Sequence, residues 1–188
     1  SRERYMNESN TNLDPSTIAR LRDAADKMEI IDLSSNYMRG LDRLDGELER
    51  RVFWDDAYCS YGTYEGGPNE FVDFCQNALK SHLSNHHFLG QINIELNGEE
   101  AFGEVYYQAF HRTKDANLNQ RDVFISGRYV DRYEKRNNVW KIAYRSELVD
   151  WVRDDPAADT WFANSPMILG ARKPDDPLYD KEKMRKRS

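Results

Sequence analysis

The sequence lacks any long apolar run: none of its stretches approaches the ~20 residues that a helix needs to cross a bilayer. Its opening residues, 1–10, have no apolar core of the kind that a signal peptide carries. Basic residues are also in deficit, with 27 Lys and Arg against 33 Asp and Glu for a net charge of −6. A nucleic-acid binder needs a basic face. These absences predict a cytoplasmic protein with neither a membrane nor a nucleic-acid partner.

Signs of a metal or cofactor are scarce as well. The two cysteines, Cys59 and Cys75, do not have metal-ligand spacing, and we expect free, buried thiols. His82 and His86 have the i, i+4 spacing of a helical metal site, but no third ligand is evident, so positions at a helix end explain them better. There is no glycine-rich phosphate loop. We therefore expect no metal, nucleotide or other cofactor.

What is present suits one domain with a full core: 188 residues, 39% hydrophobic and 12% aromatic. Residues 1–14 are polar and are expected to be flexible, while 15–152 form the domain. Residues 153–188 are rich in Pro, Asp and Lys. We expect them to be a strap over the domain or an arm that reaches a neighbouring subunit. Their apolar anchors are Trp161, Phe162, Met167, Ile168 and Leu169.

Helical patterns come first along the chain. Asp14 and Ser16 are candidate caps around Pro15, and apolar residues from Ile18 to Leu41 recur every three or four positions. This spacing predicts a long amphipathic helix that breaks near "DRLDG". A short helix at about 46–53, a short strand in 54–62 and a third helix in 66–83 follow.

Strand patterns dominate the second half. Asn97–Gly98 is a strong hairpin signal, and "KRNN" at 135–138 is a weaker one. Helices followed by long strands predict an α+β fold, in which a cone-shaped, curved antiparallel β-sheet packs on three N-terminal helices and encloses a pocket. The four strand-like runs are His87–Leu96, Ala101–His111, Val123–Glu134 and Val139–Val152.

Three segments carry a family resemblance. They are "LSSNYMRGLDRLDGELERRVFWDDAYCSYG", "HHFLGQINIEL" and "SGRYVDRYEKRNNVWKIAYRSELVDW". Their order resembles the SnoaL-like branch of the nuclear transport factor 2 superfamily, over roughly residues 18–151. The resemblance implies the same cone and, since the branch contains cofactor-independent dehydratases and a dehydrochlorinase, a lyase activity.

The lyases of this family place a His–Asp pair inside the cone. The aspartate matches Asp42, the histidine matches His87, and an arginine on the last strand matches Arg145. Five residues before the aspartate, where some members have lysine and others tyrosine, this chain has Tyr37. The resemblance implies that His87 is the base, that Asp42 orients it, that Tyr37 polarises or protonates an oxygen, and that Arg145 binds an oxyanion.

The expected reaction is an elimination from an aromatic or polycyclic small molecule. It releases water, or a small carbonyl such as formaldehyde by carbon–carbon cleavage. We expect aromatic and polar side chains on the strands to line the substrate pocket, namely Phe88, Tyr107, Phe110, His111 and Tyr129.

Each assignment has a structural alternative. Asp42 alone suits an exposed helix end, His87 a loop, and Tyr37 core packing. Arg145 alone suits neutralisation of Asp42, or an ion pair with Glu134 or Glu147 across strands.

For His111, the sequence favours a structural role over a role in the pocket. For the whole chain, the alternatives to a lyase are a non-catalytic ligand-binding module and the small subunit of a ring-hydroxylating dioxygenase. Aromatic residues on both strand faces, together with the tail anchors, predict a homo-oligomer.

Overall fold

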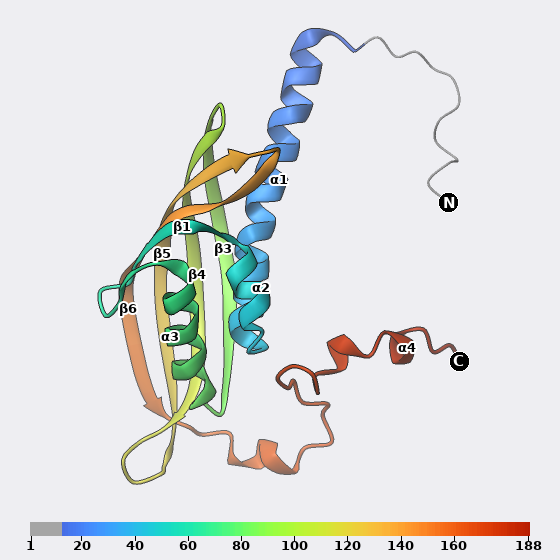
Figure 1. Cartoon of the computed structure of the whole chain (residues 1–188). Helices are drawn as coiled ribbons and strands as arrows, with labels where there is room; N and C mark the ends of the chain where they lie inside the picture. Colours follow the sequence, from blue (N-terminus) through green and yellow to red (C-terminus); the bar gives the residue numbers. More distant parts are fainter. Residues whose placement is uncertain (1–12) are drawn as a thin grey trace.

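A single curved sheet backed by helices makes up the protein in the computed structural model, which describes residues 13–188. The strand order is β2-β1-β6-β5-β4-β3 (Figure 1). Two short strands form one edge and the long strands form the rest. Their bounds are β1 Phe53–Ser60, β2 Glu65–Gly66, β3 Ser84–Asn97, β4 Glu100–Lys114, β5 Gln120–Arg136 and β6 Val139–Pro156.

The predicted α+β fold is confirmed, with one correction to the sheet. β3 to β6 pair in antiparallel fashion, through tight turns at 98–99 and 137–138 and a longer loop at 115–119. Gly98 at the first turn has a φ of 66°, where glycine fits without strain. β1, however, pairs with β6 in parallel, so the sheet is mixed rather than wholly antiparallel. The parallel pair arises because the chain crosses from β1 through α3 and three long strands before it returns beside β1.

The three predicted N-terminal helices are present as α1 Pro15–Asp42, α2 Gly46–Arg51 and α3 Pro68–Lys80. The side chain of Asp14 accepts a hydrogen bond from the backbone N–H of Thr17 at 3.0 Å, so Asp14 is the cap of α1 and Ser16 is not. A fourth helix, α4 Lys181–Met184, lies in the tail.

The amphipathic stripe expected along all of α1 is only half correct. Leu21 and Met28 are 55% and 58% exposed, and the first buried residue of the helix is Ile30. Figure 1 gives part of the reason: the first turns of α1 project past the sheet and have no surface to cover there. The contact of Asp26 with Lys135 of β5, at 2.8 Å, marks where the helix meets the sheet. The C-terminal half crosses the sheet and delivers the end of the helix to its concave face.

The core lies between that concave face, the second half of α1, and α3. Side chains of a strand alternate between its two faces, so every second residue of β3, β4 and β5 points towards the helices. Val105, Tyr107, Ala109 and His111 of β4 follow this alternation and are all buried. The same alternation decides which side chains reach the pocket.

The tail leaves β6 at Pro156 and returns to the C-terminal end of α1. Arg43, just after α1, contacts the carboxylate of Asp176 at 2.7 Å, and its carbonyl accepts a hydrogen bond from the N–H of Lys173 at 2.9 Å. Two of the apolar anchors are not buried against this domain: Trp161 is 64% exposed and Ile168 is 86% exposed. The tail is therefore held to the end of α1 by polar contacts, while these two anchors are left exposed.

Two further expectations from the sequence concern the N-terminal residues and membrane-spanning helices. Most of the segment expected to be flexible, residues 1–12 of 1–14, lies outside the described residues. Within residues 13–188, no helix combines the length and apolar character required to span a membrane.

Candidate active site

The end of α1 and the start of β3 bring Asp42 and His87 into direct contact. The ring nitrogen Nδ1 of His87 lies 2.7 Å from Oδ1 of Asp42. The backbone N–H of His87 donates to Oδ2 at 3.0 Å, and the side-chain amide of Asn85 donates to Oδ1 at 2.8 Å. With its side chain 11% exposed, the Asp42 carboxylate is held by three donors from one strand, which fixes its orientation.

The contact also fixes the tautomer of His87. An ionised carboxylate only accepts hydrogen bonds, so Nδ1 of His87 carries the proton. Nε2 then has a free lone pair, and no side chain among residues 13–188 makes a hydrogen bond to it. A neutral imidazole with a free Nε2 and an aspartate behind it is the arrangement of a general base.

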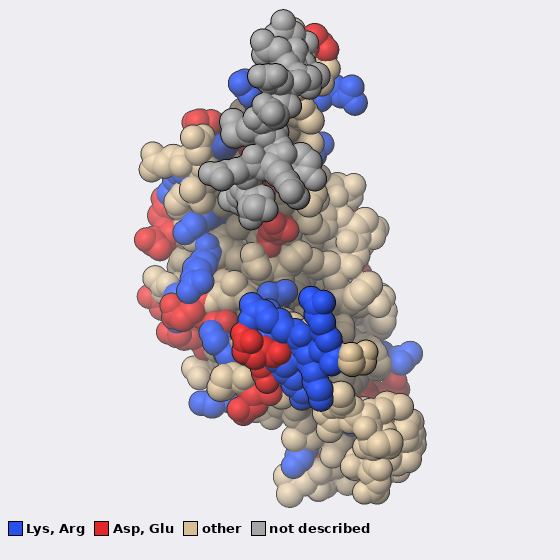
Figure 2. Space-filling view, turned by 90° about the vertical axis from the view of Figure 1, so that its right-hand side faces the viewer, with Lys and Arg blue, Asp and Glu red and all other residues tan. Residues whose placement is uncertain are grey.

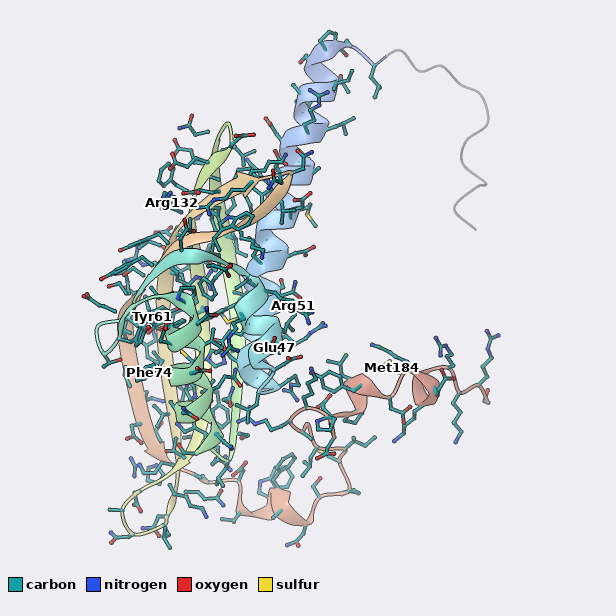
Figure 3. The ribbon with its side chains drawn as sticks, viewed as in Figure 1. Glu47, Arg51, Tyr61, Phe74, Arg132 and Met184 are labelled. Carbon is teal, nitrogen blue, oxygen red and sulfur yellow. The ribbon has the colours of Figure 1, made fainter. Side chains whose placement is uncertain are left out.

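A cavity of about 380 Å³ opens beside His87 on the concave face of the sheet. This volume lies within the range of roughly 300–1,000 Å³ typical of small-molecule sites. Its walls come from α1, α3, the loop after β1, and strands β3 to β6; Tyr61 and Phe74 are labelled in Figure 3. The lining residues are Tyr37, Leu41, Tyr61, Thr63, Phe74, Cys75, Ala78, Leu79, His82, His87, His111, Thr113, Val123, Ile125, Tyr129 and Glu147.

Three histidines gather at one end of this cavity. The rings of His87 and His111 meet edge to face with centroids 5.2 Å apart, and Nδ1 of His111 lies 3.2 Å from Nδ1 of His82. Burial lowers the pKa of His111 to about 3 and also lowers the pKa of His82. Both are therefore neutral near pH 7. His111 does line the pocket, and His82 has the expected helix-end position, just after α3. His86 was expected at a helix end as well, but it lies within β3, because the strand begins at Ser84.

Tyr37 lies in the wall of the cavity, 1% exposed. Its hydroxyl lies 2.9 Å from the hydroxyl of Tyr61, and its ring meets that of Tyr129 edge to face at 5.8 Å. Burial raises the pKa of Tyr37 well above its usual range, so the phenol stays protonated and can act as a hydrogen-bond donor.

Arg145 lies beneath the cavity rather than in its wall. Its guanidinium makes two hydrogen bonds to Asp131, at 2.9 and 2.7 Å, and its centre lies 4.6 and 4.3 Å from the rings of Tyr37 and Tyr129. Both members of the ion pair have fully buried side chains. Arg145 is therefore not among the residues that line the cavity, and its carboxylate partner is Asp131 rather than Asp42, Glu134 or Glu147.

Two of the expected lining residues are on the wrong face. Phe88 is 63% exposed on the convex side of the sheet, and Phe110 packs there against Phe124. The reason is alternation: since His87 and His111 point inward, their neighbours Phe88 and Phe110 must point outward. The alternation of side chains along a strand would have been enough to place both phenylalanines outside the pocket. Of the other expected lining residues, Tyr129 is in the wall. Tyr107 is buried behind it rather than among the lining residues, and its ring stacks on that of Tyr129 at 4.7 Å.

Glu147 is the main residue that sequence reasoning missed. It lies on β6, two residues after Arg145 and on the same face, and it is directly opposite Tyr129 in the register. The hydroxyl of Tyr107 donates to its Oε1 at 2.6 Å. Burial raises the pKa of Glu147, and the hydrogen bond from Tyr107 only partly opposes that shift.

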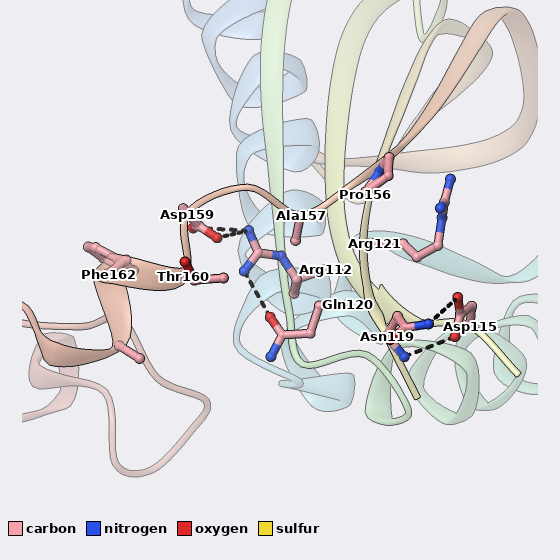
Figure 4. Close-up of a pocket in the computed structure, with 11 residues that line it drawn as sticks. Arg112, Asp115, Asn119, Gln120, Arg121, Pro156, Ala157, Asp159, Thr160 and Phe162 are labelled. Atoms are coloured by element: carbon pink, nitrogen blue, oxygen red, sulfur yellow. Dashed lines mark hydrogen bonds and ion pairs between the residues drawn. The ribbon is translucent and has the colours of Figure 1, made fainter. Parts of the chain in front are cut away.

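A second, larger hollow of about 670 Å³ lies where the β4–β5 turn meets the tail (Figure 4). Its charged groups already have partners: Arg112 pairs with Asp122 and Asp159, and Asp115 accepts hydrogen bonds from Asn119. These acids and bases are engaged with one another, whereas the smaller cavity holds His87 with its free Nε2, so the smaller cavity is the candidate active site. In the described part of the chain, no three His, Cys, Asp or Glu side chains are grouped as metal ligands.

Solved structures of similar fold include three with informative names. A hexachlorocyclohexane dehydrochlorinase, LinA type 2, has a TM-score of 0.68 at 23% identity and covers 79% of this chain and 99% of its own. A putative scytalone dehydratase from Novosphingobium aromaticivorans DSM 12444 has a TM-score of 0.62 at 19% identity, and the match covers 72% of this chain and 91% of the dehydratase. A putative aromatic ring hydroxylase from Novosphingobium aromaticivorans has a TM-score of 0.62 at 20% identity, and the match covers 72% of this chain and 96% of the hydroxylase.

The sequence comparison is consistent with these likenesses in fold. No curated protein sequence matches the chain. The profile of the SnoaL-like domain, however, matches residues 22–146, which run from the first turns of α1 to β6 and include both Asp42 and His87. The chain therefore belongs to the SnoaL-like domain family, within the nuclear transport factor 2-like superfamily.

Proposed function

We propose that the protein is a cofactor-independent lyase that acts on an aromatic or polycyclic small molecule. The observation that carries the proposal is the Asp42–His87 pair, with Nδ1 to Oδ1 at 2.7 Å and the imidazole at the wall of an aromatic cavity. A binding module needs a cavity but has no use for a buried carboxylate that three donors hold behind a histidine.

The chemistry follows from the roles available. His87 removes a proton from a substrate carbon through Nε2, and Asp42 stabilises the imidazolium that forms. The phenol of Tyr37, linked to Tyr61, donates a hydrogen bond to a substrate oxygen that gains negative charge. With a C–H bond broken in this way, the leaving group is water. Where a carbon–carbon bond breaks instead, His87 takes the proton from the hydroxyl group of the departing carbon, the electron pair of the broken bond stays on the substrate, and a small carbonyl such as formaldehyde leaves.

The names of two structural relatives, a dehydrochlorinase and a putative dehydratase, support an elimination. The rings of Tyr37, Tyr61, Phe74 and Tyr129 in the cavity wall support an aromatic substrate. The volume of about 380 Å³ leaves room for a fused or substituted ring system rather than a small aliphatic acid.

The proposal is tested with a panel of aryl β-hydroxy ketones, aryl β-chloro ketones and aryl 1,3-diols in buffer that contains a chelator. We expect conjugated alkene, seen by absorbance, or released formaldehyde from at least one compound class, at a rate unaffected by the chelator. Binding of panel compounds by calorimetry without any turnover would instead identify a non-catalytic ligand-binding module. Activity that needs an added divalent metal would overturn the cofactor-independent mechanism.

We further propose that the protein is a homo-oligomer. Phe88 and Phe102 are 63% and 44% exposed on the convex sheet face, and Ile168 of the tail is 86% exposed. Figure 2, viewed from the side of α1 and the tail, shows wide uncharged areas beside clusters of charged side chains. Burial of these surfaces between copies explains their composition. Sedimentation equilibrium should give a mass above 22.1 kDa at micromolar concentration, and a monomer there would refute the proposal.

A further inference from the structure

We propose that Glu147 and Tyr107 form a subsite for a hydroxyl group of the substrate, and that Glu147 gives its proton to that oxygen when it leaves. The inference rests on the proposed function and narrows it to a dehydration. The two side chains come from β6 and β4, on either side of Tyr129 of β5, and Glu147 lies in the same cavity wall as His87. Two proton-transfer groups thus face one substrate.

The hydrogen bond between Tyr107 and Glu147 is possible because β5, which lies between their strands, has no side chain where the ring of Tyr107 crosses it. Tyr107 lies directly opposite Gly127 in the β4–β5 register. A Cβ at Gly127 would clash with the backbone oxygen of Leu148 at 2.1 Å, and it would also come within 3.0 Å of the Tyr107 hydroxyl and 3.1 Å of its ring. Glycine therefore lets the ring of Tyr107 lie across β5, where its hydroxyl reaches Oε1 of Glu147 at 2.6 Å.

The hydrogen bond from Tyr107 uses only one of the two carboxyl oxygens. Oε1 accepts it, whereas Oε2 has no hydrogen-bond partner among residues 13–188. Burial raises the pKa of Glu147, which favours the neutral acid. A neutral carboxyl can donate from Oε2 and accept at Oε1. A hydroxyl group also both donates and accepts, so it matches this site, whereas a halide or a carboxylate does not.

In an elimination the two groups act on the two ends of the bond that becomes a double bond. Nε2 of His87 takes the proton from carbon, and the electrons of that C–H bond form the C=C bond. The carbon–oxygen bond breaks, its electron pair goes to the oxygen, and the Glu147 carboxyl protonates that oxygen so that water leaves. His87 ends as imidazolium and Glu147 as carboxylate, and one proton returned through solvent restores both.

The subsite is tested by binding rather than by turnover, with 2-naphthol and naphthalene as matched probes that are both neutral at pH 7. We expect the wild-type protein to bind 2-naphthol at least 10-fold more tightly than naphthalene, as measured by fluorescence titration. Glu147→Leu should abolish that preference. Glu147→Gln should keep it, because an amide still donates and accepts, while losing the ability to protonate a leaving group. Glu95→Leu, the same change at an exposed strand position, should leave the preference intact.

The outcomes separate this inference from the proposed lyase activity. Equal affinities in the wild type, no binding of either probe, or a preference that survives in Glu147→Leu would each overturn the subsite. Thermal unfolding of each variant shows whether a lost preference reflects a lost fold, and Glu147→Gln provides the isosteric case. The binding preference is measured without turnover, so a panel that shows no elimination would refute the lyase while leaving this result unchanged.

Discussion

Replacement of His87 with Gln should lower kcat on the substrate found in the panel by roughly 100-fold or more, the usual scale for a lost acid–base group. Glutamine keeps the size of the side chain but cannot accept a carbon-bound proton near pH 7. Asp42→Asn should cost a comparable factor, since an amide can turn its N–H towards Nδ1 and favour the wrong tautomer of His87. Steady-state kinetics on both variants, with KM determined separately, measure the effect.

The adjacent histidine supplies the matched control. His86 is exposed on the convex face, and its residue pair in β4 is Phe110 rather than a cavity residue. His86→Gln should therefore retain kcat within about twofold. If His87→Gln turns over as fast as the wild type, the pair is not the base, and Tyr37 with the groups around it becomes the alternative.

The dyad could be anticipated from the sequence because the family resemblance implies an aspartate and a histidine at these positions, and because both residues lie near the ends of elements that the sequence marks. The "DRLDG" break ends α1 at Asp42, and "NHHFLGQINIEL" opens β3, so the fold has only to bring a helix end to a strand entrance. The hydrogen bond from the backbone N–H of His87 to Asp42 belongs to this same junction. Asn85, which completes the junction, is two residues earlier on the same strand face.

The rest of the cavity was harder to anticipate for two physical reasons. Tyr61 enters from a loop, where no periodicity shows which way a side chain points. Glu147 depends on Tyr107 crossing over Gly127, a contact between three strands that no single-strand pattern contains. Phe88 and Phe110 were errors of a different kind, because strand alternation alone excludes them once His87 and His111 are placed inside.

The largest expected loss of stability is at Asp131. Asp131→Ala should lower the free energy of unfolding by about 3–5 kcal/mol, because it leaves the guanidinium of Arg145 charged, fully buried and without its carboxylate. The hydroxyl of Tyr133, which donates to Asp131 at 2.6 Å, loses its acceptor as well. Urea denaturation measures the loss. Glu104→Ala, which breaks the half-exposed pair with Arg128, should cost less than about 1 kcal/mol.

A double variant then separates the structural role of Arg145 from the catalytic role that the family resemblance implies. Arg145→Met with Asp131→Leu removes both charges and keeps apolar volume, so it should recover most of the stability lost in Asp131→Ala. Because the guanidinium lies beneath Tyr37 and Tyr129 and not in the cavity wall, we expect this variant to keep kcat within about tenfold. A folded double variant with a loss of 100-fold or more would restore Arg145 as an electrostatic participant in the reaction, acting through the two tyrosine rings.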